Sequence, residues 1–302
     1  MRRPSFELRG QLRGQLWGQL LVAVAAVSCS APLVRVAEAP SLAIAFWRTA
    51  IATLLLLPFL VWRCRSEVLT LNKKQVLGLF GSGVFLAIHF ATWIASVEMT
   101  TVASSVLLVT TSPVFVAIAS MMLGERPSRR VWLGIGLAGV GGVVIAAADL
   151  GISAGSLKGD LLALVGAVSV SGYLLMGRGL RQRLSLLTYA VGVYGSCAAV
   201  LAVAMLFSRT SFVGYSSPTW LLLVAMALGP QLLGHTTFNF LLGRLESFKV
   251  AAATLGEPIG SGLIAAFAFG EVPRLWVFPG ALLLLAGVAL ALGRSTDFVS
   301  EK

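Results

Sequence analysis

The stretch Gly270–Pro273 reads GEVP and repeats Gly124–Pro127, which reads GERP, after an interval of 146 residues. The same interval links three further pairs of identical residues: His89 with His235, Gly134 with Gly280, and Gly141 with Gly287. Any single match carries little weight in a chain rich in glycine and alanine. Their common order along the chain indicates an internal duplication, in which the second half repeats the first.

The composition is that of a membrane protein. Of the 302 residues, 57% are hydrophobic and 12% are charged, and the mean hydropathy is +0.90, whereas about a quarter of the residues are charged in an ordinary soluble protein. A membrane-spanning helix needs about 20 mostly apolar residues. Ten stretches have roughly this length: 17–36, 41–62, 75–97, 102–123, 130–148, 158–177, 186–207, 218–243, 248–270 and 274–293. No remaining segment is long enough for a soluble domain, so any function must be built within the helices.

Each copy of the duplication contains five of these helices. Because five is odd, the second copy enters the membrane from the opposite side, and the copies are inverted repeats. The predicted fold is an all-α integral membrane protein with ten transmembrane helices. Its parts are an N-terminal tail (1–16), a first repeat (17–148), an extracytoplasmic linker (149–157), a second repeat (158–293) and a C-terminal tail (294–302). Inverted repeats are typical of transporters that work by alternating access around a midplane site.

The basic residues give the orientation. Eighteen of the 23 Lys and Arg residues fall in the two tails and in the alternate loops that lie on the same side as the tails. Cytoplasmic loops carry the excess of Lys and Arg, so both termini are predicted to be cytoplasmic. The net charge of +11 is therefore a topology signal, and we expect no nucleic-acid partner.

Glu257 is the acid that lies deepest in a predicted helix, within the sequence LGEPIGS of Leu255–Ser261. An ionised carboxylate at the centre of a membrane helix costs about 2.5–3.5 kcal/mol on insertion scales, and such acids usually have a function. Pro258 removes a backbone donor and Gly256 permits close approach, so we expect a helix break or hinge beside a polar cavity. Glu257 would there carry a proton or accept a cationic substrate group.

Thr111 is equivalent to Glu257 in the first repeat, and it lies in the most hydroxyl-rich part of any predicted helix. Ser105 and Ser112 belong to the same stretch, and Pro113 follows. These hydroxyls either satisfy the carbonyl groups that Pro113 frees or hydrogen-bond a zwitterion in the cavity. An acid in one half and neutral groups in the other would bind a substrate in a preferred orientation.

His89 and His235 occupy equivalent places in the two repeats. An imidazole changes protonation near neutral pH, so the pair could relay protons with Glu257; the alternative is a buried histidine that bonds a carbonyl. Trp93 lies one turn after His89 and Asn239 one turn after His235. We expect Trp93 to form an apolar cavity wall, unless it only packs between helices, and Asn239 to be a polar contact. Two histidines without a nearby acidic or cysteine cluster do not make a metal site.

Arg48 is the cation deepest in an apolar stretch. It could snorkel outward, pair with an acid or attract a substrate carboxylate. The alternative role for Glu257 is an internal hydrogen bond, to Arg48 or His235, that fixes helix packing. Glu125 and Glu271 lie at helix ends, where we expect them to act as interfacial caps or gates.

These residues together resemble the drug/metabolite transporter superfamily of the EamA type. The motifs that carry the resemblance are Phe46-Trp47-Arg48, His89-Phe90 with Trp93 and Ser96, Ser112-Pro113, Gly124-Glu125, Gly234-His235 with Asn239, Gly256-Glu257-Pro258 and Gly270-Glu271. The resemblance spans nearly the whole chain. It implies a bacterial inner-membrane exporter of amino acids, related metabolites or drugs, with a central cavity between its third, fourth, eighth and ninth helices. It also implies outermost fifth and tenth helices that support a homodimer.

The leading hypothesis is a secondary transporter that exports small polar metabolites, above all amino acids or their derivatives, by alternating access, with proton exchange as the candidate coupling. The chain has no Gly-x-x-x-x-Gly-Lys-Ser/Thr loop for ATP, and we expect no cofactor. An exporter of lipophilic cations or drugs is the second transporter hypothesis. An intramembrane enzyme would need a nucleophile with its base or paired acids, which the sequence does not offer. A scaffold or receptor leaves the buried acid and the duplication unexplained.

Overall fold

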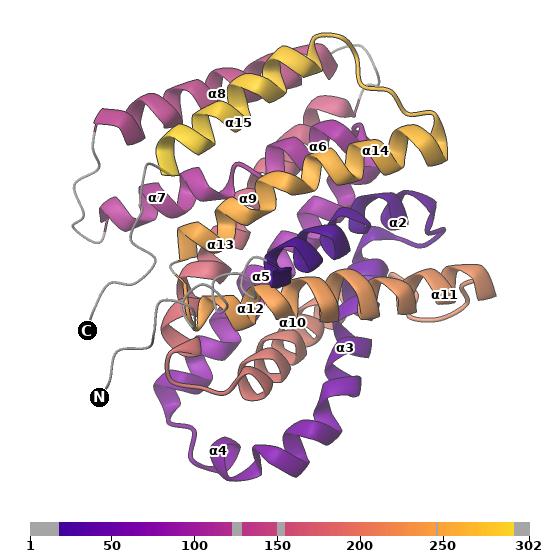
Figure 1. The fold of residues 1–302 in the computed structure, drawn as a ribbon. Helices are drawn as coiled ribbons and strands as arrows, with labels where there is room; N and C mark the ends of the chain where they lie inside the picture. The colour runs from indigo at the N-terminus through magenta and orange to yellow at the C-terminus, as the bar shows by residue number, and fades with distance from the viewer. Residues whose placement is uncertain (1–17, 123–128, 150–154, 246, 293–302) are drawn as a thin grey trace.

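The computed structural model describes residues 18–122, 129–149, 155–245 and 247–292, and every regular element in these ranges is helical (Figure 1). Seven of the helices are long and apolar enough to cross a membrane: Gly18–Val36, Ser41–Arg63, Lys73–Met99, Val102–Ala119, Ser156–Arg181, Leu186–Ser208 and Ser217–Leu242. The remaining three predicted spans correspond to shorter apolar helices, which are Trp132–Ala148, Thr254–Phe269 and Val277–Leu290. The chain is therefore a multi-pass membrane protein.

The first half consists of helical residues 18–28 and seven labelled helices. These are α2 (Ser30–Val36), α3 (Ser41–Arg63), α4 (Arg65–Leu69), α5 (Lys73–Met99), α6 (Val102–Val109), α7 (Ser112–Met122) and α8 (Arg129–Asp149). The second half contains α9 (Ser156–Arg181), α10 (Leu186–Ser208), α11 (Ser217–Met226), the π-helix η1 (Ala227–His235), α12 (Thr236–Leu242), α13 (Ser247–Ala253), the 3-10 turn η2 (Thr254–Gly256), α14 (Glu257–Phe269) and α15 (Val277–Leu292). The last helix begins three residues later than the sequence predicts.

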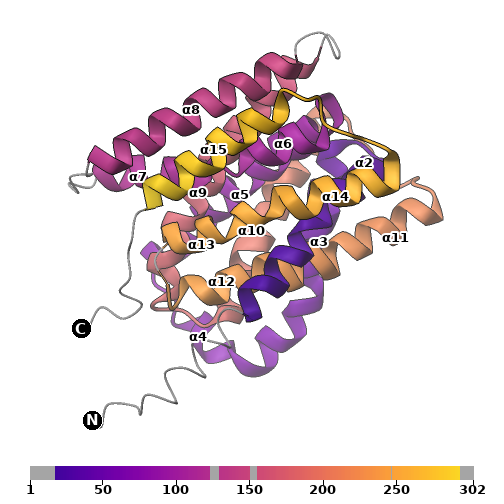
Figure 2. The ribbon, with the colours of Figure 1, turned by 45° about the horizontal axis from the view of Figure 1, so that its top comes forward.

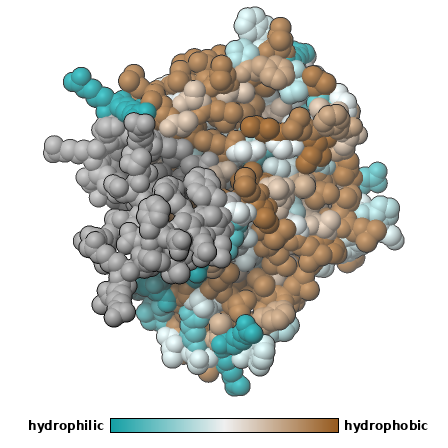
Figure 3. All heavy atoms as spheres, viewed as in Figure 1, coloured by the Kyte–Doolittle hydropathy of each residue, from teal (hydrophilic) through white to brown (hydrophobic). Residues whose placement is uncertain are grey.

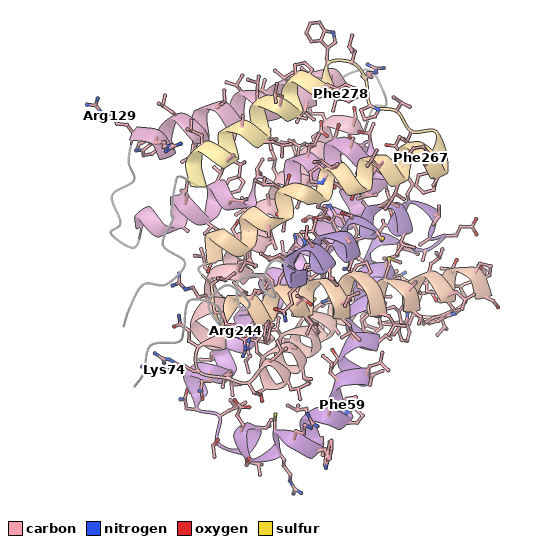
Figure 4. The ribbon with its side chains drawn as sticks, viewed as in Figure 1. Phe59, Lys74, Arg129, Arg244, Phe267 and Phe278 are labelled. Carbon is pink, nitrogen blue, oxygen red and sulfur yellow. The ribbon has the colours of Figure 1, made fainter. Side chains whose placement is uncertain are left out.

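The surface of the bundle is suited to lipid. Hydrophobic residues cover much of the described surface on the face shown in Figure 3. Large apolar side chains project outward, as at Phe59 and Phe267, which are 53% and 89% exposed (Figure 4). Lys74, Arg129 and Arg244 all lie in the left half of the molecule in Figure 4, with Arg129 at its upper end and the other two lower down. The charge pattern assigns these three residues to one side of the membrane.

Two helices are interrupted at equivalent positions in the two halves. In the first half α6 ends at Val109 and α7 begins at Ser112, directly before Pro113. In the second half the 3-10 turn η2 separates α13 from α14, and Pro258 follows the break. Proline cannot donate a backbone hydrogen bond and clashes with the preceding turn, so each proline accounts for the interruption beside it. The interruptions lie beside Pro113 and at Gly256 and Pro258, where the sequence analysis expects a helix break or hinge.

The segment before His235 is wound as a π-helix with Pro230 inside it. π-Helical turns are rare and frequently occur at functional sites. Here the wider turn accommodates a proline within a long span, and it carries Gln231 into the interior, where the side chain is fully buried. The span from Ser217 to Leu242 is therefore a continuous helical rod with an irregular centre.

Helices α8 and α15 pack closely against each other along one edge of the bundle (Figures 1 and 2). A Cβ atom added at Gly141 would lie 2.6 Å from the carbonyl oxygen of Gly280, and one added at Gly287 would lie 2.6 Å from that of Gly134. The contacts pair early residues of one helix with late residues of the other, so the helices are antiparallel. These four glycines form the two pairs that the 146-residue interval links, and their lack of side chains permits the contact.

A polar contact holds the short helix α4 to the start of α10. The Glu67 carboxylate accepts hydrogen bonds from the Ser185 amide at 2.7 Å and from the Thr188 hydroxyl at 2.6 Å. Partial desolvation would raise the pKa of the Glu67 carboxyl, but the hydrogen bonds from Ser185 and Thr188 outweigh it and the pKa lies below its usual value. Glu67 thus supplies a negative charge to a helix N-terminus, where the helix dipole favours one.

We predict that Gly141→Ala lowers the melting temperature of the purified protein. The new methyl group would collide with backbone atoms of α15, and overpacking of this kind typically costs about 1–3 kcal/mol. Gly139→Ala is the matched control, because it lies on the same helix with nothing within 4 Å of its added Cβ. Equal melting temperatures for the two variants would contradict the close packing of α8 and α15.

We predict that Glu67→Gln lowers the melting temperature at neutral pH. Because the folded-state pKa is depressed, the carboxylate stabilises the protein above the ordinary pKa of 4.5, and this contribution is lost as the pH falls through the lower folded-state pKa. The difference between the variant and the unmodified protein should therefore shrink in acid. Glu38→Gln, at an exposed position, should leave the pH profile unchanged. A difference for Glu67→Gln that is independent of pH would exclude this role.

Candidate functional site

A central cavity lies where the interrupted helices meet the middle of the long spans. Both halves of the chain line it: Val27, Ser30, His89, Trp93, Val109, Thr110 and Ser112 from the first half, and Val170, Tyr173, Leu174, His235, Phe238, Val250, Thr254 and Glu257 from the second. Its volume is about 50 Å³, whereas one water molecule needs about 10–15 Å³ by the same measure of volume. The cavity in this conformation therefore has room for a few water molecules, and a larger solute would need the walls to move.

Glu257 contributes an acid to the cavity wall. It is the first residue of α14, and it is only 9% exposed. No hydrogen bond or ion pair joins its carboxylate to another residue in the described part of the chain. The helix that carries it lies against the first helix, because a Cβ atom at Gly260 would be 2.4 Å from the Ser28 hydroxyl and one at Gly256 would be 3.0 Å from Val24. The expected close approach at Gly256 is present, and it holds the acid beside the cavity.

The two histidines face the same cavity. The Nδ1 atom of His89 lies 2.9 Å from the carbonyl oxygen of Gly166; because a carbonyl can only accept, Nδ1 carries the proton. The ring centroids of His89 and His235 are 6.4 Å apart. Within the described ranges no hydrogen bond links either imidazole to Glu257. The structure therefore brings together the three groups of the predicted relay without connecting them directly.

Aromatic side chains form the wall around the histidines. Trp93 is stacked on His89, with ring centroids 6.0 Å apart and planes at 3°, and it lines the cavity as predicted. Phe238 also lines the cavity, and its ring lies 6.4 Å from that of His235. Tyr173 adds a phenol that the sequence analysis did not single out.

Asn239 lies behind the cavity wall. Its amide oxygen accepts a hydrogen bond from the Tyr173 hydroxyl, and its amide nitrogen donates to the Tyr194 hydroxyl at 3.0 Å. The side chain is fully buried and is absent from the lining of the cavity. Asn239 thus orients Tyr173, and the expected direct contact with the cavity is wrong for this conformation. A sequence signal for Tyr173 was available, since it is one of only four tyrosines.

The hydroxyl-rich stretch divides into two parts. Ser112 lines the cavity, whereas Thr111 donates to the carbonyl oxygen of Leu108 at 2.6 Å. Ser105 shares a 2.6 Å hydrogen bond with Ser96. Ser105 and Thr111 are not among the lining residues, so the structure favours their backbone and packing roles over a substrate contact.

Arg48 is fully buried next to the cavity, so of its three alternatives the outward snorkelling does not occur in this structure. Its Nη1 atom donates to the Ser30 hydroxyl at 3.0 Å, and its Nε atom donates to the amide oxygen of Gln231 at 3.1 Å. The guanidinium carbon lies 4.2 Å from the centre of the Phe90 ring. Among the described residues no acid forms an ion pair with Arg48. The internal bond between Glu257 and Arg48, the alternative role for Glu257, is therefore not formed.

Glu271 closes one end of the bundle. One carboxylate oxygen accepts a hydrogen bond from the backbone amide of Val102 at 2.6 Å, which caps α6, and the other lies 3.2 Å from Arg35. Arg35 also donates to the carbonyl oxygens of Val97 at 2.7 Å and Thr100 at 3.1 Å. Contacts between the two halves therefore join the ends of α2, α5 and α14 to the start of α6. The corresponding Glu125 lies outside the described residues.

Arg181 has the equivalent place at the opposite end, 146 residues after Arg35. It donates to the carbonyl oxygen of Asn239 at 3.0 Å, near the end of α12, and also to that of Leu184. This repeated arginine is a sequence signal for both ends of the bundle.

For metals, no group of three or more His, Cys, Asp or Glu side chains comes together in the described part of the chain.

Known proteins share both the sequence pattern and the fold. Two proteins of Archaeoglobus fulgidus, each called an uncharacterized transporter, are 26% and 25% identical to this chain over 254 and 271 residues. Each match covers 83% of this chain, and 86% or 87% of the relative. The uncharacterized transporter YcxC of Bacillus subtilis is 30% identical over 190 residues, which is 58% of this chain and 60% of YcxC.

A solved crystal structure matches the fold with a TM-score of 0.66 at 22% identity, covering 94% of this chain and 99% of the other. The sequence profile of the EamA-like transporter family matches the chain twice, at residues 12–147 and at residues 157–293. These two matches cover nearly the whole sequence, and the chain belongs to the EamA-like transporter family.

Proposed function

We propose that this protein is a secondary active transporter that exports small polar metabolites, with amino acids and their derivatives as the leading class. It works by alternating access, and protons are the candidate coupling ion. In this proposal ten helices form two inverted repeats (17–148 and 158–293) in the inner membrane of a bacterium, with both termini in the cytoplasm. The observation that carries the proposal is the Glu257 carboxylate, which has no hydrogen-bond or ion-pair partner among the described residues and lies in a cavity lined by both halves.

The chemistry of Glu257 supports a bound cation. A carboxylate taken out of water loses hydration that it must recover from a partner. In the described structure Glu257 has no such partner, and it lies beside neutral donors and acceptors such as Ser112 and Thr254. A substrate ammonium group or a proton would supply the missing partner. Exchange of one for the other at the same carboxylate would couple substrate movement to a proton gradient.

The position of the cavity supports alternating access. Both halves contribute to its wall, so a movement of one half against the other would change its exposure. The orientation predicted from the charges puts the Arg35–Glu271 contact at the extracytoplasmic end. This contact joins the two halves there, and its opening would release the substrate from the cavity to the outside. The small volume of the cavity agrees with a conformation in which substrate passage requires such a movement.

The aromatic wall favours a second candidate, export of lipophilic cations. Trp93, Tyr173 and Phe238 line the cavity together with Glu257. Aromatic faces attract cations, and an acid beside them would add a charge partner.

In both candidates the lipid bilayer surrounds the bundle, and the exposed apolar faces of α8 and α15 are the surface available for a homodimer.

We predict that Glu257→Gln abolishes export in cells that overproduce the protein. A charge-assisted hydrogen bond is worth about 1.5–3 kcal/mol, so its loss should weaken handling of the substrate by roughly tenfold or more. Cells challenged with toxic amino acids, metabolite analogues and cationic drugs would show which resistance the variant loses. Glu98→Gln makes the same change at an exposed position near the end of α5 and should keep resistance.

The outcomes of this screen separate the candidates. Loss of resistance to amino acid analogues supports the leading class, and loss confined to cationic drugs supports the second. If Glu257→Gln transports neutral amino acids as well as the unmodified protein, Glu257 is not the proton carrier. Reconstituted vesicles that show no flux of any of these solutes would favour a scaffold or receptor.

We predict that Glu271→Gln exposes the cavity to the extracytoplasmic side. The change removes the charge that holds Arg35, so the closed end should open more often. The measurement is labelling of Ser112→Cys from outside the cell by a membrane-impermeant thiol reagent. Labelling should be severalfold faster when Glu271→Gln is added to Ser112→Cys.

This labelling needs a background without the native cysteines Cys29, Cys64 and Cys197, which are all free thiols. Glu38→Gln is the control, because Glu38 is an exposed acid near the end of the first span. Equal labelling with and without Glu271→Gln would show that the Arg35–Glu271 contact does not close the cavity.

A further inference from the structure

Three buried side-chain donors near the cavity have no hydrogen-bond acceptor among the described residues. They are the Nη2 atom of Arg48, the amide nitrogen of Gln231 and the indole nitrogen of Trp93. Arg48 and Gln231 are fully buried, and Trp93 is 4% exposed. A buried donor that lacks a partner loses the hydrogen bonds it made to water, which is costly. Arg48 and Gln231 are hydrogen-bonded to each other, and Trp93 lines the same cavity as the Ser30 hydroxyl that contacts Arg48, so an acceptor bound in this cavity would lie beside these donors.

The donors are connected to the cavity through Ser30 and Trp93, which both line it. The Ser30 hydroxyl accepts a hydrogen bond from Arg48, and a hydroxyl that accepts can still donate its own hydrogen. Within the described ranges no residue accepts that hydrogen. Ser30 therefore presents a donor to the cavity, with the Arg48 charge directly behind it. Trp93 lies in the same wall, and its buried indole nitrogen has no acceptor among the described residues.

The cavity thus has a cationic side and an anionic side. Arg48 and Ser30 come from the first half, whereas Glu257 comes from the second. Neither charge has an ion-pair partner among the described residues. A solute that carries both a carboxylate and an ammonium group would supply a partner to each. A solute with an ammonium group alone would leave the donors beside Arg48 unsatisfied.

We propose that Arg48, Ser30 and Trp93 form a carboxylate-binding subsite, and that the substrate is an amino acid zwitterion. This inference rests on the proposed transport function and names the group that selects its substrate. The carboxylate accepts from Ser30 and from the Trp93 indole, while Arg48 provides the positive charge behind Ser30. The ammonium group lies at Glu257. The apolar wall that includes Val27, Val109 and Leu174 receives the side chain.

Ligand binding tests the subsite separately from transport. The purified protein would be titrated with L-threonine, L-leucine and L-phenylalanine, and with the primary amide of each, while its melting temperature is followed. The amides keep the ammonium group and the side chain but lose the negative charge. A bound ligand raises the melting temperature. We expect at least one amino acid to reach half of its maximal shift at a concentration about tenfold or more below that of its amide.

Variants then assign the preference to the subsite. In Arg48→Gln, the amide and the amino acid should reach their half-maximal shifts at nearly the same concentration, so that their ratio is close to one. Arg48→Lys should retain part of the preference for the amino acid. Ser30→Ala removes the donor that faces the cavity with a much smaller change, so it tests the subsite if Arg48→Gln does not fold. Ser169→Ala is its matched control, because Ser169 is also buried, donates to the carbonyl oxygen of Val165 on its own helix at 2.8 Å and is absent from the cavity lining.

Each outcome has one meaning for the subsite. The subsite would be overturned if the amino acid and its amide shift the melting temperature equally, or if neither shifts it. A ratio that is unchanged in both Arg48→Gln and Ser30→Ala, with only a lower melting temperature, would show a structural role for these residues and also overturn it. Flux in vesicles decides the proposed function independently. Preferential binding without flux would support the subsite and refute transport. Flux without preferential binding would support transport and refute the subsite.

Discussion

Charge buried in an apolar helix bundle is the constraint on which the other features depend. A charged group at this depth needs compensation, because hydrocarbon supplies neither hydrogen bonds nor screening. Glu257 and Arg48 are both nearly or fully buried, yet neither forms an ion pair with another described residue. The local structure is arranged around these two charges. Ser30 and Gln231 hold the guanidinium, and the start of α14 holds the carboxylate where the helix dipole favours it.

The interruptions in the helices explain how such a site forms in a bundle of regular helices. An unbroken α-helix uses its backbone groups internally and presents only side chains to its neighbours. At Pro113 and Pro258 the regular pattern stops, and residues around each break line the cavity. The glycines beside the second break let α14 approach the first helix closely. The π-helix before His235 adds a third irregular segment and brings Gln231 to Arg48. Three departures from regular winding therefore converge on the same place.

The contacts at the two ends of the bundle follow the duplication as well. Arg35 and Arg181 are separated by the repeat interval, and each donates to backbone carbonyls at the end of a long span. Arg35 meets an acid from the other half, Glu271, which also caps α6. A charge pair at a bundle end can separate without dismantling the apolar packing, because its partners can be rehydrated there. The interior between the ends has no such source of water, and its polar groups must be paired within the protein or by a bound solute.

The sequence alone determined the membrane class, the duplication and the positions of the helix breaks, because these depend on apolar length, on identical residues at a fixed interval and on the local geometry of proline. It also singled out Glu257, His89, His235, Trp93 and Ser112, which line one cavity in the structure, since intramembrane polar residues gather where they can be solvated. Only the tertiary structure decided which polar residues face the cavity and which stand behind it. Asn239, Ser105 and Thr111 are turned to neighbouring groups, whereas Ser30 and Tyr173 line the wall. The reason is that a side chain's direction on a helix is fixed by the rotation of that helix in the bundle. That rotation is set by contacts between residues far apart in the chain, such as Gly260 with Ser28 and Arg48 with Gln231.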